Sequence, residues 1–237
     1  MDKGFFKSTA AVLRQGCIAL SALALAYSCA QADETPRPLP PPQLDEPAPT
    51  VGSETAVLSG GCFWGMQGVF EHVRGVRRVV SGYSGGTRDA AHYDDVSNGD
   101  TGHAESVEII FDPRQVSYGE ILRVFFSVAH DPTELNRQGP DTGTNYRSDI
   151  FFANPGQERV ARAYVAQLEQ AHAFSGPIVT RLDPLTAFYA AEDYHQDYLI
   201  HHPDSPYIIV NDLPKIANLK RIYPALYRET PVMVSAR

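Results

Sequence analysis

The sequence predicts an α/β (α+β) fold, a two-layer sandwich of a mixed β-sheet with packed helices, followed by a long irregular C-terminal tail. Short β-prone segments alternate with segments whose apolar residues recur at helical spacing, and glycine and proline pairs separate them. No internal repeat is present. At 237 residues the chain is long enough for one well-filled domain and short for two separate cores.

Strands and helices are expected to alternate along this domain. Residue patterns predict strands over residues 55–58, 76–83, 103–111 and 149–152. Apolar spacing predicts a helix over residues 63–73. Ser117 and Glu120 form a capping box for a second helix, which runs to about residue 129, and Asn154-Pro155 opens a third. A further helix–strand stretch precedes the tail.

The N-terminal residues are typical of an export signal. Lys3, Lys7 and Arg14 form a positive region around the start of an apolar run over residues 18–26. That run is too short to span a bilayer. We therefore expect residues 1–32 to be a signal peptide.

Two processing sites compete after the apolar run. Ala30-Gln31-Ala32 favours cleavage before Asp33, whereas Ser28-Cys29 resembles the end of a lipoprotein box, in which a lipid is attached to Cys29. Either route predicts an exported, periplasmic protein, and the second adds a membrane anchor.

Residues 33–52 are expected to be a linker, and residues 53–237 a single catalytic domain. Seven prolines between Thr35 and Pro49 favour extended, polyproline-type spacing. Such a segment builds no core, so we interpret it as a spacer.

Charge and cysteine content narrow the function. The net charge is −8, and loss of residues 1–32, with three cations and one carboxylate, would make it −10, which argues against nucleic acid as a partner. Of the three cysteines, Cys17 and Cys29 fall within the signal region. Cys62 is then an unpaired thiol in an exported chain, which indicates a reactive site; a buried structural cysteine is the alternative.

Cys62 stands where a strand ends and a helix begins. After Gly60-Gly61, its sulfur is expected near the positive end of the helix dipole, which predicts a thiol pKa lowered from about 8.5 to about 3.5–7.5. The glycines permit a tight turn and close approach of a ligand. Phe63 and Trp64 point in different directions, so at least one is expected to line an apolar pocket beside the sulfur, unless both are core aromatics.

Glu105 is predicted to face the interior. Strand parity places it on the face of Val107, Ile109 and Phe111. Apolar surroundings raise the pKa of a carboxyl, so Glu105 should stay protonated and act as a general acid; a carboxylate paired with arginine is the alternative. The sequence thus predicts a lowered pKa for the thiol of Cys62 and a raised pKa for the carboxyl of Glu105. This pair suits a reaction in which a soft nucleophile attacks and oxygen leaves as water.

Four segments in order resemble the peptide methionine sulfoxide reductase A family. They are residues 61–65 (GCFWG), Tyr93, residues 102–105 (GHAE) and residues 136–148, within a similarity that covers Ser53 to Ile200. The resemblance implies a ferredoxin-like sandwich. It also implies an enzyme that reduces protein-bound and free methionine S-sulfoxide and so repairs oxidative damage.

The resemblance implies catalytic roles for five residues. Cys62 would be the nucleophile and pass through a sulfenic acid, and Glu105 would protonate the sulfoxide oxygen. Tyr93 and Tyr146 would hydrogen-bond that oxygen, and Asp141 would order the site.

Substrate binding is implied for two aromatic residues. Phe63 and Trp64 would hold the substrate methyl group. His103 and His195 lie in matching segments without an assigned role, and His195 is interpreted as a core histidine. Glu192-Asp193 is interpreted as a solvated helix face.

Recycling is expected to need an outside reductant. Many members of the family carry resolving cysteines near the C-terminus, and residues 201–237 contain none. A thioredoxin-like protein or a small thiol would then reduce the sulfenic acid. We expect no metal and no other cofactor, because the histidines show no zinc-type spacing with cysteines. We also expect the protein to be a monomer.

Two other functions remain open at this point. In a Cys-His hydrolase, His103 would activate Cys62 and Asp141 would orient the histidine. A non-enzymatic module would bind Met-rich peptides through Phe63 and Trp64. The hydrolase would need no reductant, and the module would survive Cys62→Ser.

Overall fold

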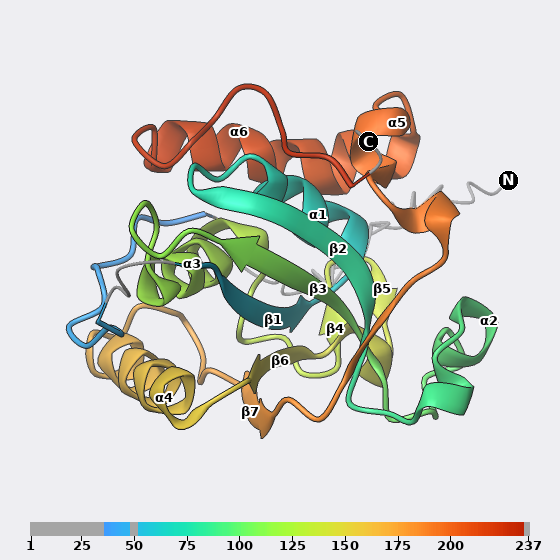
Figure 1. Cartoon of the computed structure of the whole chain (residues 1–237), viewed down its shortest axis with the longest axis horizontal. Coiled ribbons are helices and arrows are strands. Elements are labelled where there is room, and N and C mark those ends of the chain that lie inside the picture. The colour runs from blue at the N-terminus through green and yellow to red at the C-terminus, as the bar shows by residue number, and fades with distance from the viewer. Residues whose placement is uncertain (1–35, 48–51, 235–237) are drawn as a thin grey trace, which may run out of the picture.

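The computed structural model describes residues 36–47 and 52–234, so the expected signal peptide and Cys29 lie outside the described residues. Six strands form one sheet in the order β7-β6-β1-β3-β2-β8 (Figure 1). Neighbouring strands are antiparallel except β6 and β7, which confirms the mixed sheet. The strands are β1 Glu54–Gly60, β2 Val76–Ser84, β3 Ala104–Phe111, β6 Ser148–Phe152, β7 Arg181–Pro184 and β8 Phe188–Ala190.

Four of these strands form the ferredoxin-like core. The chain runs β1–α1–β2–β3–α3–β6, and the strands lie in the order β6-β1-β3-β2. The capping box of Ser117 and Glu120 starts α3 as expected, and its last turns continue as the wider helix η2 to Ala129. The helices are α1 Phe63–Glu71, α2 Tyr93–Val96, α3 Tyr118–Val124, α4 Pro155–Gln170, α5 Tyr198–His201 and α6 Leu213–Ile222.

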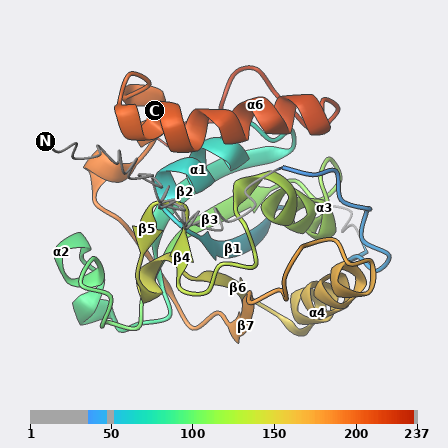
Figure 2. The same ribbon diagram turned by 180° about the vertical axis from the view of Figure 1, so that it is seen from behind.

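Short elements complete the chain. The hairpin of β4 (Arg137–Gln138) and β5 (Asp141–Thr142) lies below α1 in Figure 2. Three single turns are η1 Arg88–Ala90, η3 Thr144–Tyr146 and η4 Asp193–His195, and two wider helical segments are η2 Phe125–Ala129 and η5 Ile208–Asp212. No helix in the described part of the chain is long and apolar enough to cross a membrane.

One face of the sheet carries the main core. On β3, Val107 pairs with Leu58 and Ile109 pairs with Ala56, and all four join the helices in one apolar cluster. The opposite face has only a small cluster around Val57, Ala104 and Phe151. Strand parity therefore predicted the face correctly, and it places Glu105 among the buried residues.

The C-terminal segment differs from the irregular tail that the sequence predicted. It contains η5 and the helix α6, which packs beside α1 (Figure 1). Leu213, Ile216, Leu219 and Ile222 recur every third residue, and Leu219 is fully buried. This periodicity is a helical signal, and the prediction of a tail was wrong there because the segment is short and follows many turn-forming residues.

The proline-rich segment also differs from the expected spacer in its described part. Leu39 is only 3% exposed and joins the main core. Its N–H donates to the hydroxyl of Tyr223, and its carbonyl accepts from Arg123. The carbonyl of Pro40 accepts from Tyr164. Prolines lack N–H donors but keep their carbonyls, so an extended proline segment is held by side-chain donors of the domain.

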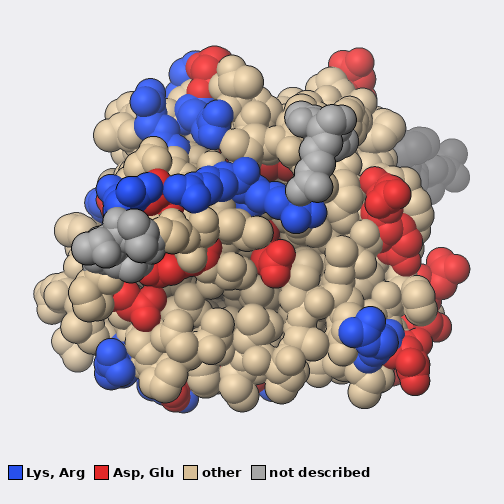
Figure 3. Space-filling model, viewed as in Figure 1, with Lys and Arg blue, Asp and Glu red and all other residues tan. Residues whose placement is uncertain are grey.

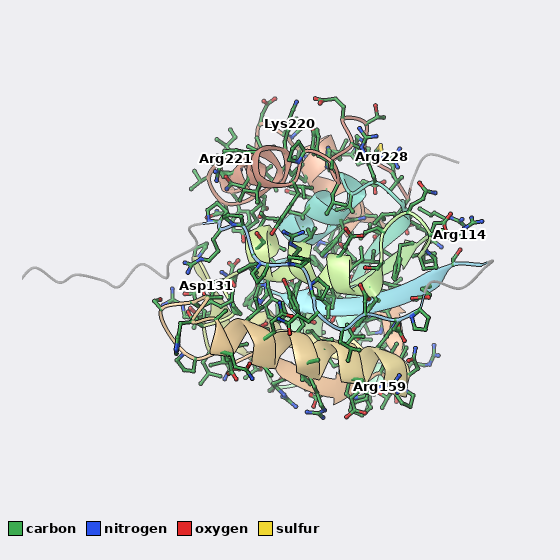
Figure 4. All side chains as sticks on the ribbon, turned by 90° about the vertical axis from the view of Figure 1, so that its left-hand side faces the viewer. Arg114, Asp131, Arg159, Lys220, Arg221 and Arg228 are labelled. Atoms are coloured by element: carbon green, nitrogen blue, oxygen red, sulfur yellow. The ribbon has the colours of Figure 1, made fainter. Side chains whose placement is uncertain are left out.

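Charge is unevenly distributed over the surface. On the face that Figure 1 presents, Lys and Arg side chains form a band across the middle, although the chain is acidic overall (Figure 3). Figure 4 shows Arg159 of α4 and Lys220 and Arg221 of α6 at opposite edges of the molecule. These helices turn their polar sides outward and their apolar sides to the core.

The turn between β1 and α1 requires glycine. Gly61 has a φ of +96°, and a Cβ there would lie 2.6 Å from Cβ and Cγ of Gln138 on β4. A Cβ on Gly60 would lie 2.9 Å from the ring of His130. The strand can therefore pass into the helix only through residues without side chains, and this turn sets where Cys62 lies.

We expect Gly61→Ala to lower the free energy of unfolding by about 1–3 kcal/mol from backbone strain, and further because Gln138 must move. Urea unfolding measures the change. Gly99→Ala is the matched control, because Gly99 has a φ of +79° but no atom nearer than 3.5 Å to its Cβ position. Equal losses in the two variants would contradict the close contact with Gln138.

Candidate active site

A pocket of about 210 Å³ opens at the start of α1. Its walls come from α1, α2, β3, β5, η3 and the turn before η5. It includes all seven residues expected in the site, together with Tyr207. The lining residues are Cys62, Phe63, Trp64, Tyr93, Glu105, Asp141, Tyr146 and Tyr207.

Cys62 is the residue immediately before α1 and is a free, buried thiol at the pocket. Burial raises its pKa well above the ordinary value, and the carboxylates of Glu105 and Asp212 raise it further. A hydrogen bond from the backbone N–H of Trp64 lowers it, as expected at a helix start, but is outweighed. The predicted low pKa was therefore wrong, and the resting residue is a thiol.

Glu105 lies on β3 and is 3% exposed. The backbone N–H of Phe63 donates to its Oε2 at 3.0 Å. Burial raises the pKa of this carboxyl to about 8, although the bond from Phe63 opposes the shift and Asp141 adds to it. Glu105 is therefore protonated at neutral pH, as predicted. When it is neutral, its repulsion of a thiolate on Cys62 disappears.

Two phenols face the pocket from separate elements. Tyr93 begins α2 and Tyr146 ends η3. Burial raises the pKa of both, and Glu105 raises them further. Both hydroxyls therefore keep their protons and can donate hydrogen bonds to an oxygen atom in the pocket. Asp141 on β5 accepts a hydrogen bond from the Tyr207 hydroxyl.

An aromatic wall forms the apolar side of the pocket. Phe63 is 1% exposed, and its ring lies 5.0 Å from that of His195. Trp64 stacks on Tyr198 with ring centroids 3.8 Å apart and meets Tyr207 edge-on at 5.9 Å. Phe63 and Trp64 thus face the same pocket although they are adjacent on the helix. A small apolar group beside the sulfur would contact them.

Together these residues place a nucleophilic sulfur, a neutral acid and two hydroxyl donors around one small space. A protein-family model described as peptide methionine sulfoxide reductase matches residues 54–225. The chain belongs to this family. The match covers all eight lining residues.

Proteins with similar sequences are also named peptide methionine sulfoxide reductases. Peptide methionine sulfoxide reductase MsrA 2 of Mesorhizobium japonicum is 58% identical over 191 residues, which cover 81% of this chain and 97% of the relative. Peptide methionine sulfoxide reductase MsrA of Deinococcus radiodurans is 46% identical over 175 residues, which cover 74% of this chain and 84% of the relative. The chain is accordingly a peptide methionine sulfoxide reductase, an oxidoreductase.

Solved structures agree with the fold. Methionine sulfoxide reductase A of Corynebacterium diphtheriae matches with a TM-score of 0.56 and 36% identity, over 72% of this chain and 84% of that one. Mxr1 of Saccharomyces cerevisiae in reduced form matches with a TM-score of 0.58 and 29% identity, over 67% and 91%. The mixed sheet with packed helices is therefore shared with these two solved structures.

His195 is buried, as the sequence predicted, and it also supports the reductase pocket. Its Nδ1 accepts from the indole N–H of Trp64 at 3.2 Å, and its ring lies 4.5 Å from that of Tyr93. Burial lowers its pKa, so the ring is neutral and can accept this bond. The histidine therefore fixes one aromatic wall residue and contacts a phenol.

Glu192 is not the solvated carboxylate that the sequence predicted. Its Oε1 accepts from the backbone N–H of Tyr93 at 3.0 Å, and its Oε2 accepts from the hydroxyl of Tyr83 at 2.8 Å. Its carbonyl also accepts from the N–H of His195. Glu192 therefore joins α2, β2 and η4 behind the pocket, while Asp193 is exposed.

The arrangement for a Cys-His hydrolase is missing around His103. Its Nδ1 accepts from the N–H of Gly86, and its Nε2 faces the carbonyl of Thr87 at 2.9 Å. Both ring nitrogens are thus used to hold the turn after β2. Among the residues that the structure describes, no group of three or more His, Cys, Asp or Glu side chains could hold a metal ion.

Sequence reasoning missed Tyr207 and Tyr198. Both lie in the C-terminal part of the chain, in short elements without a recognisable motif. A tyrosine between Pro206 and Ile208 carries no local signal for a pocket. Only the packing of this segment against Trp64 reveals it.

Removing the acid of Glu105 should change how stability depends on pH. A carboxyl whose pKa rises from 4.5 to about 8 on folding binds its proton more tightly in the folded chain, so stability falls as pH rises through that window. We expect Glu105→Gln to gain stability relative to the wild type by up to about 1.4 kcal/mol for each pH unit between these values. Urea unfolding at pH 5.5 and 8.5 measures it. The same shift in Glu169→Gln, an exposed position on α4, would contradict this assignment.

Loss of the Glu192 carboxyl should weaken the reductase without touching its pocket walls. We expect Glu192→Ala to lower kcat/KM for N-acetylmethionine sulfoxide about tenfold, because charge-assisted hydrogen bonds to Tyr93 and Tyr83 are lost. Glu192→Gln keeps an acceptor oxygen and should recover much of the activity. Asp193→Ala is the exposed control. An equal loss of kcat/KM in that variant would contradict the role of the Glu192 hydrogen bonds.

Proposed function

We propose that the thiol of Cys62 reduces methionine S-sulfoxide in oxidised proteins and in the free amino acid, and so repairs oxidative damage. One observation supports this most: the sulfur of Cys62 and the carboxyl of Glu105, whose pKa is about 8, line the same small pocket. A hydrogen bond from the backbone N–H of Phe63 holds that carboxyl next to the residue that follows Cys62. A neutral acid beside a nucleophile is what oxygen needs in order to leave sulfur.

In the proposed reaction, the Cys62 sulfur attacks the sulfoxide while Glu105 donates its proton to the oxygen. Tyr93 and Tyr146 hydrogen-bond that oxygen as charge develops on it. The attack forms a bond between the Cys62 sulfur and the substrate sulfur, and the thiol proton passes to Glu105. The hydroxyl group then moves from the substrate sulfur to the Cys62 sulfur as the bond between the two sulfurs breaks, and methionine leaves. Cys62 then carries the oxygen as a sulfenic acid, so two electrons have passed from the cysteine to the substrate sulfur.

Three fixed positions around a chiral sulfur accept only one epimer, and we propose that it is the S epimer. Phe63 and Trp64 offer the apolar wall for the methyl group. Tyr93, Tyr146 and Glu105 offer the donors for oxygen. The third substituent, the side chain, must point to solvent, so the other epimer would direct its oxygen at the aromatic wall.

We infer that an outside thiol closes the cycle. The sequence holds Cys17, Cys29 and Cys62 and has no cysteine after Cys62. Two thiols of a thioredoxin-like protein, or two molecules of a small thiol, would reduce the sulfenic acid, form a disulfide and release water. Asp141 would order the site through the hydroxyl of Tyr207. No bound cofactor is needed in this scheme.

We also propose that the protein is exported to the periplasm, on the strength of the N-terminal pattern. Cleavage before Asp33 would release it, and acylation of Cys29 would anchor it in the membrane. The mass of the N-terminal peptide from the periplasmic and membrane fractions distinguishes the two forms. A full-length protein in the cytoplasm would contradict export.

The reaction is tested with separated S and R epimers of N-acetylmethionine sulfoxide and excess dithiothreitol. We expect turnover of the S epimer, complete loss with Cys62→Ser, and a loss of about 10²–10⁴-fold with Glu105→Gln. Because only protonated Glu105 can donate, wild-type kcat/KM should fall as pH rises through about 8.

Three results would contradict the proposal: turnover of the R epimer alone, activity in Cys62→Ser, or more than one turnover without any thiol. A sulfenic-acid trap that adds its mass to Cys62 after one turnover tests the intermediate. The hydrolase alternative would instead give an acyl-enzyme and no sulfenic acid.

A further inference from the structure

A buried ion pair packs against the first turn of α1. Asp212 ends η5 and is completely buried, and its Oδ1 lies 3.4 Å from Nζ of Lys215 on α6, whose side chain is 13% exposed. A Cβ added to Gly65 would lie 2.1 Å from that carboxylate oxygen and 3.3 Å from that Nζ. The pair therefore fills the place that a side chain at position 65 would take. Charged groups are rarely buried this completely, and neither of these two lines the pocket.

The glycine at position 65 matches this carboxylate. Gly65 is the third residue of α1 and does not have a positive φ, so the helix backbone does not require glycine there. Glycine inside a helix is less stable than alanine. The close approach of Asp212 is the contact that excludes a larger residue. The carboxylate is thus built into the start of α1, which also carries the nucleophile.

The same contact brings the carboxylate within one helical turn of Cys62. Cys62 is the N-cap residue of α1, and Gly65 follows three positions later. An N-cap side chain and the residue three positions on face each other, as they do in a capping box. Residues at this spacing have Cβ atoms about 5–6 Å apart. Burial and Glu105 raise the pKa of the Cys62 thiol, and Asp212 raises it further, as this placement requires.

Titratable groups from several elements act on Cys62. They are Glu105 on β3, Asp141 on β5, Tyr93 on α2, Tyr146 on η3, Tyr207 just before η5 and Asp212 at its end. Glu105 keeps its proton at neutral pH, and burial raises the pKa of each phenol, so these groups carry no charge there. The negative charge beside the thiol therefore comes from the two aspartates, and Asp212 has the larger effect.

We propose that Asp212 is a positioning residue that acts through Cys62: its carboxylate, held against α1 beside Lys215, keeps the sulfur in its thiol form between turnovers and so limits its oxidation by hydrogen peroxide. This role rests on the proposed function, in which Cys62 is the nucleophile. It explains how one sulfur can react with a sulfoxide and yet resist an oxidant that also attacks methionine.

The two reactions differ in what happens to the thiol proton. With hydrogen peroxide, the thiolate sulfur attacks one oxygen, the O–O bond breaks and hydroxide leaves, which makes a sulfenic acid on Cys62. A second peroxide oxidises this group to a sulfinic acid, which thiols do not reduce. With a sulfoxide in the pocket, Glu105 gives its proton to the substrate oxygen and can then take the thiol proton. A charge that favours the thiol therefore slows the peroxide reaction more than sulfoxide reduction.

Ionisation of Cys62 is measured from the ultraviolet absorbance of its thiolate during a pH titration. Each full-length protein is compared with the same protein carrying Cys62→Ser, so that Cys17 and Cys29 cancel in the difference. Asp212→Asn keeps the shape of the side chain and removes its charge. We expect the midpoint of the titration to lie at lower pH in this variant than in the wild type, because the nearby negative charge is lost.

Two further variants accompany this one. Asp212→Asn leaves the ammonium of Lys215 without its carboxylate, whereas Asp212→Asn/Lys215→Gln removes both charges. Replacement of both members of a buried pair is better tolerated than loss of one. The double variant should also titrate at lower pH than the wild type. Asp204→Asn is the matched control, because Asp204 is an exposed carboxylate of the same C-terminal segment, and it should not move the midpoint.

Peroxide resistance is measured as the rate at which the peptide that contains Cys62 gains the mass of a sulfinic acid in hydrogen peroxide without a thiol. At neutral pH we expect this rate to be about tenfold higher in Asp212→Asn than in the wild type, because loss of one nearby charge raises the thiolate fraction by about that factor. Asp204→Asn should oxidise at the rate of the wild type.

Several outcomes would overturn the role of Asp212. They are an unchanged midpoint in the variants that lack its charge, the same shift in Asp204→Asn, or a lower midpoint without faster oxidation by peroxide. Unfolding in urea checks that the variants are folded, and loss of folding in both would show that the pair serves stability instead. Failure of the proposed function would look different: reduction of N-acetylmethionine sulfoxide by Cys62→Ser would refute the nucleophile and leave the measured ionisation of Cys62 as it is.

Discussion

The hydrogen bond from the backbone N–H of Phe63 to Glu105 is the constraint on which the site depends. It joins the first residue of α1 to the strand β3 next to β1, so the nucleophile and the acid are held by the sheet itself. The pairing of Leu58 with Val107 fixes the register of β1 and β3 two residues from Glu105 and four residues from Cys62. Glycines 60 and 61 allow the chain to turn within that distance.

Burial of this pair changes the chemistry that a helix start would otherwise favour. A cysteine at the first turn of a helix is expected to ionise easily. Here removal from water raises the pKa of Cys62 and brings the pKa of Glu105 to about 8, so both protons stay in place at neutral pH. A neutral Glu105 removes one source of repulsion to a thiolate. In the proposed reaction, Glu105 gives its proton to the oxygen and takes up the proton of Cys62.

The second half of the chain completes the pocket through long-range contacts. Tyr207 holds Asp141 and contacts Trp64, and His195 accepts from Trp64. Glu192 fixes the start of α2, from which Tyr93 faces the pocket. Tyr207, His195 and Glu192 all lie outside the ferredoxin-like core. The core positions the sulfur and the acid, and the later short elements shape the space around them.

The sequence by itself determined the fold class, the strand face of Glu105 and the residues that meet at Cys62. These follow from periodicity and from motifs in which neighbouring residues carry the signal. The helix α6, the docking of Leu39 and the walls from Tyr198 and Tyr207 were decided by the tertiary structure, because each depends on contacts between distant segments. The tertiary structure also decided the pKa of the Cys62 thiol. The helix start that would lower this pKa is visible in the sequence, but the burial and the nearby carboxylates that raise it arise only on folding.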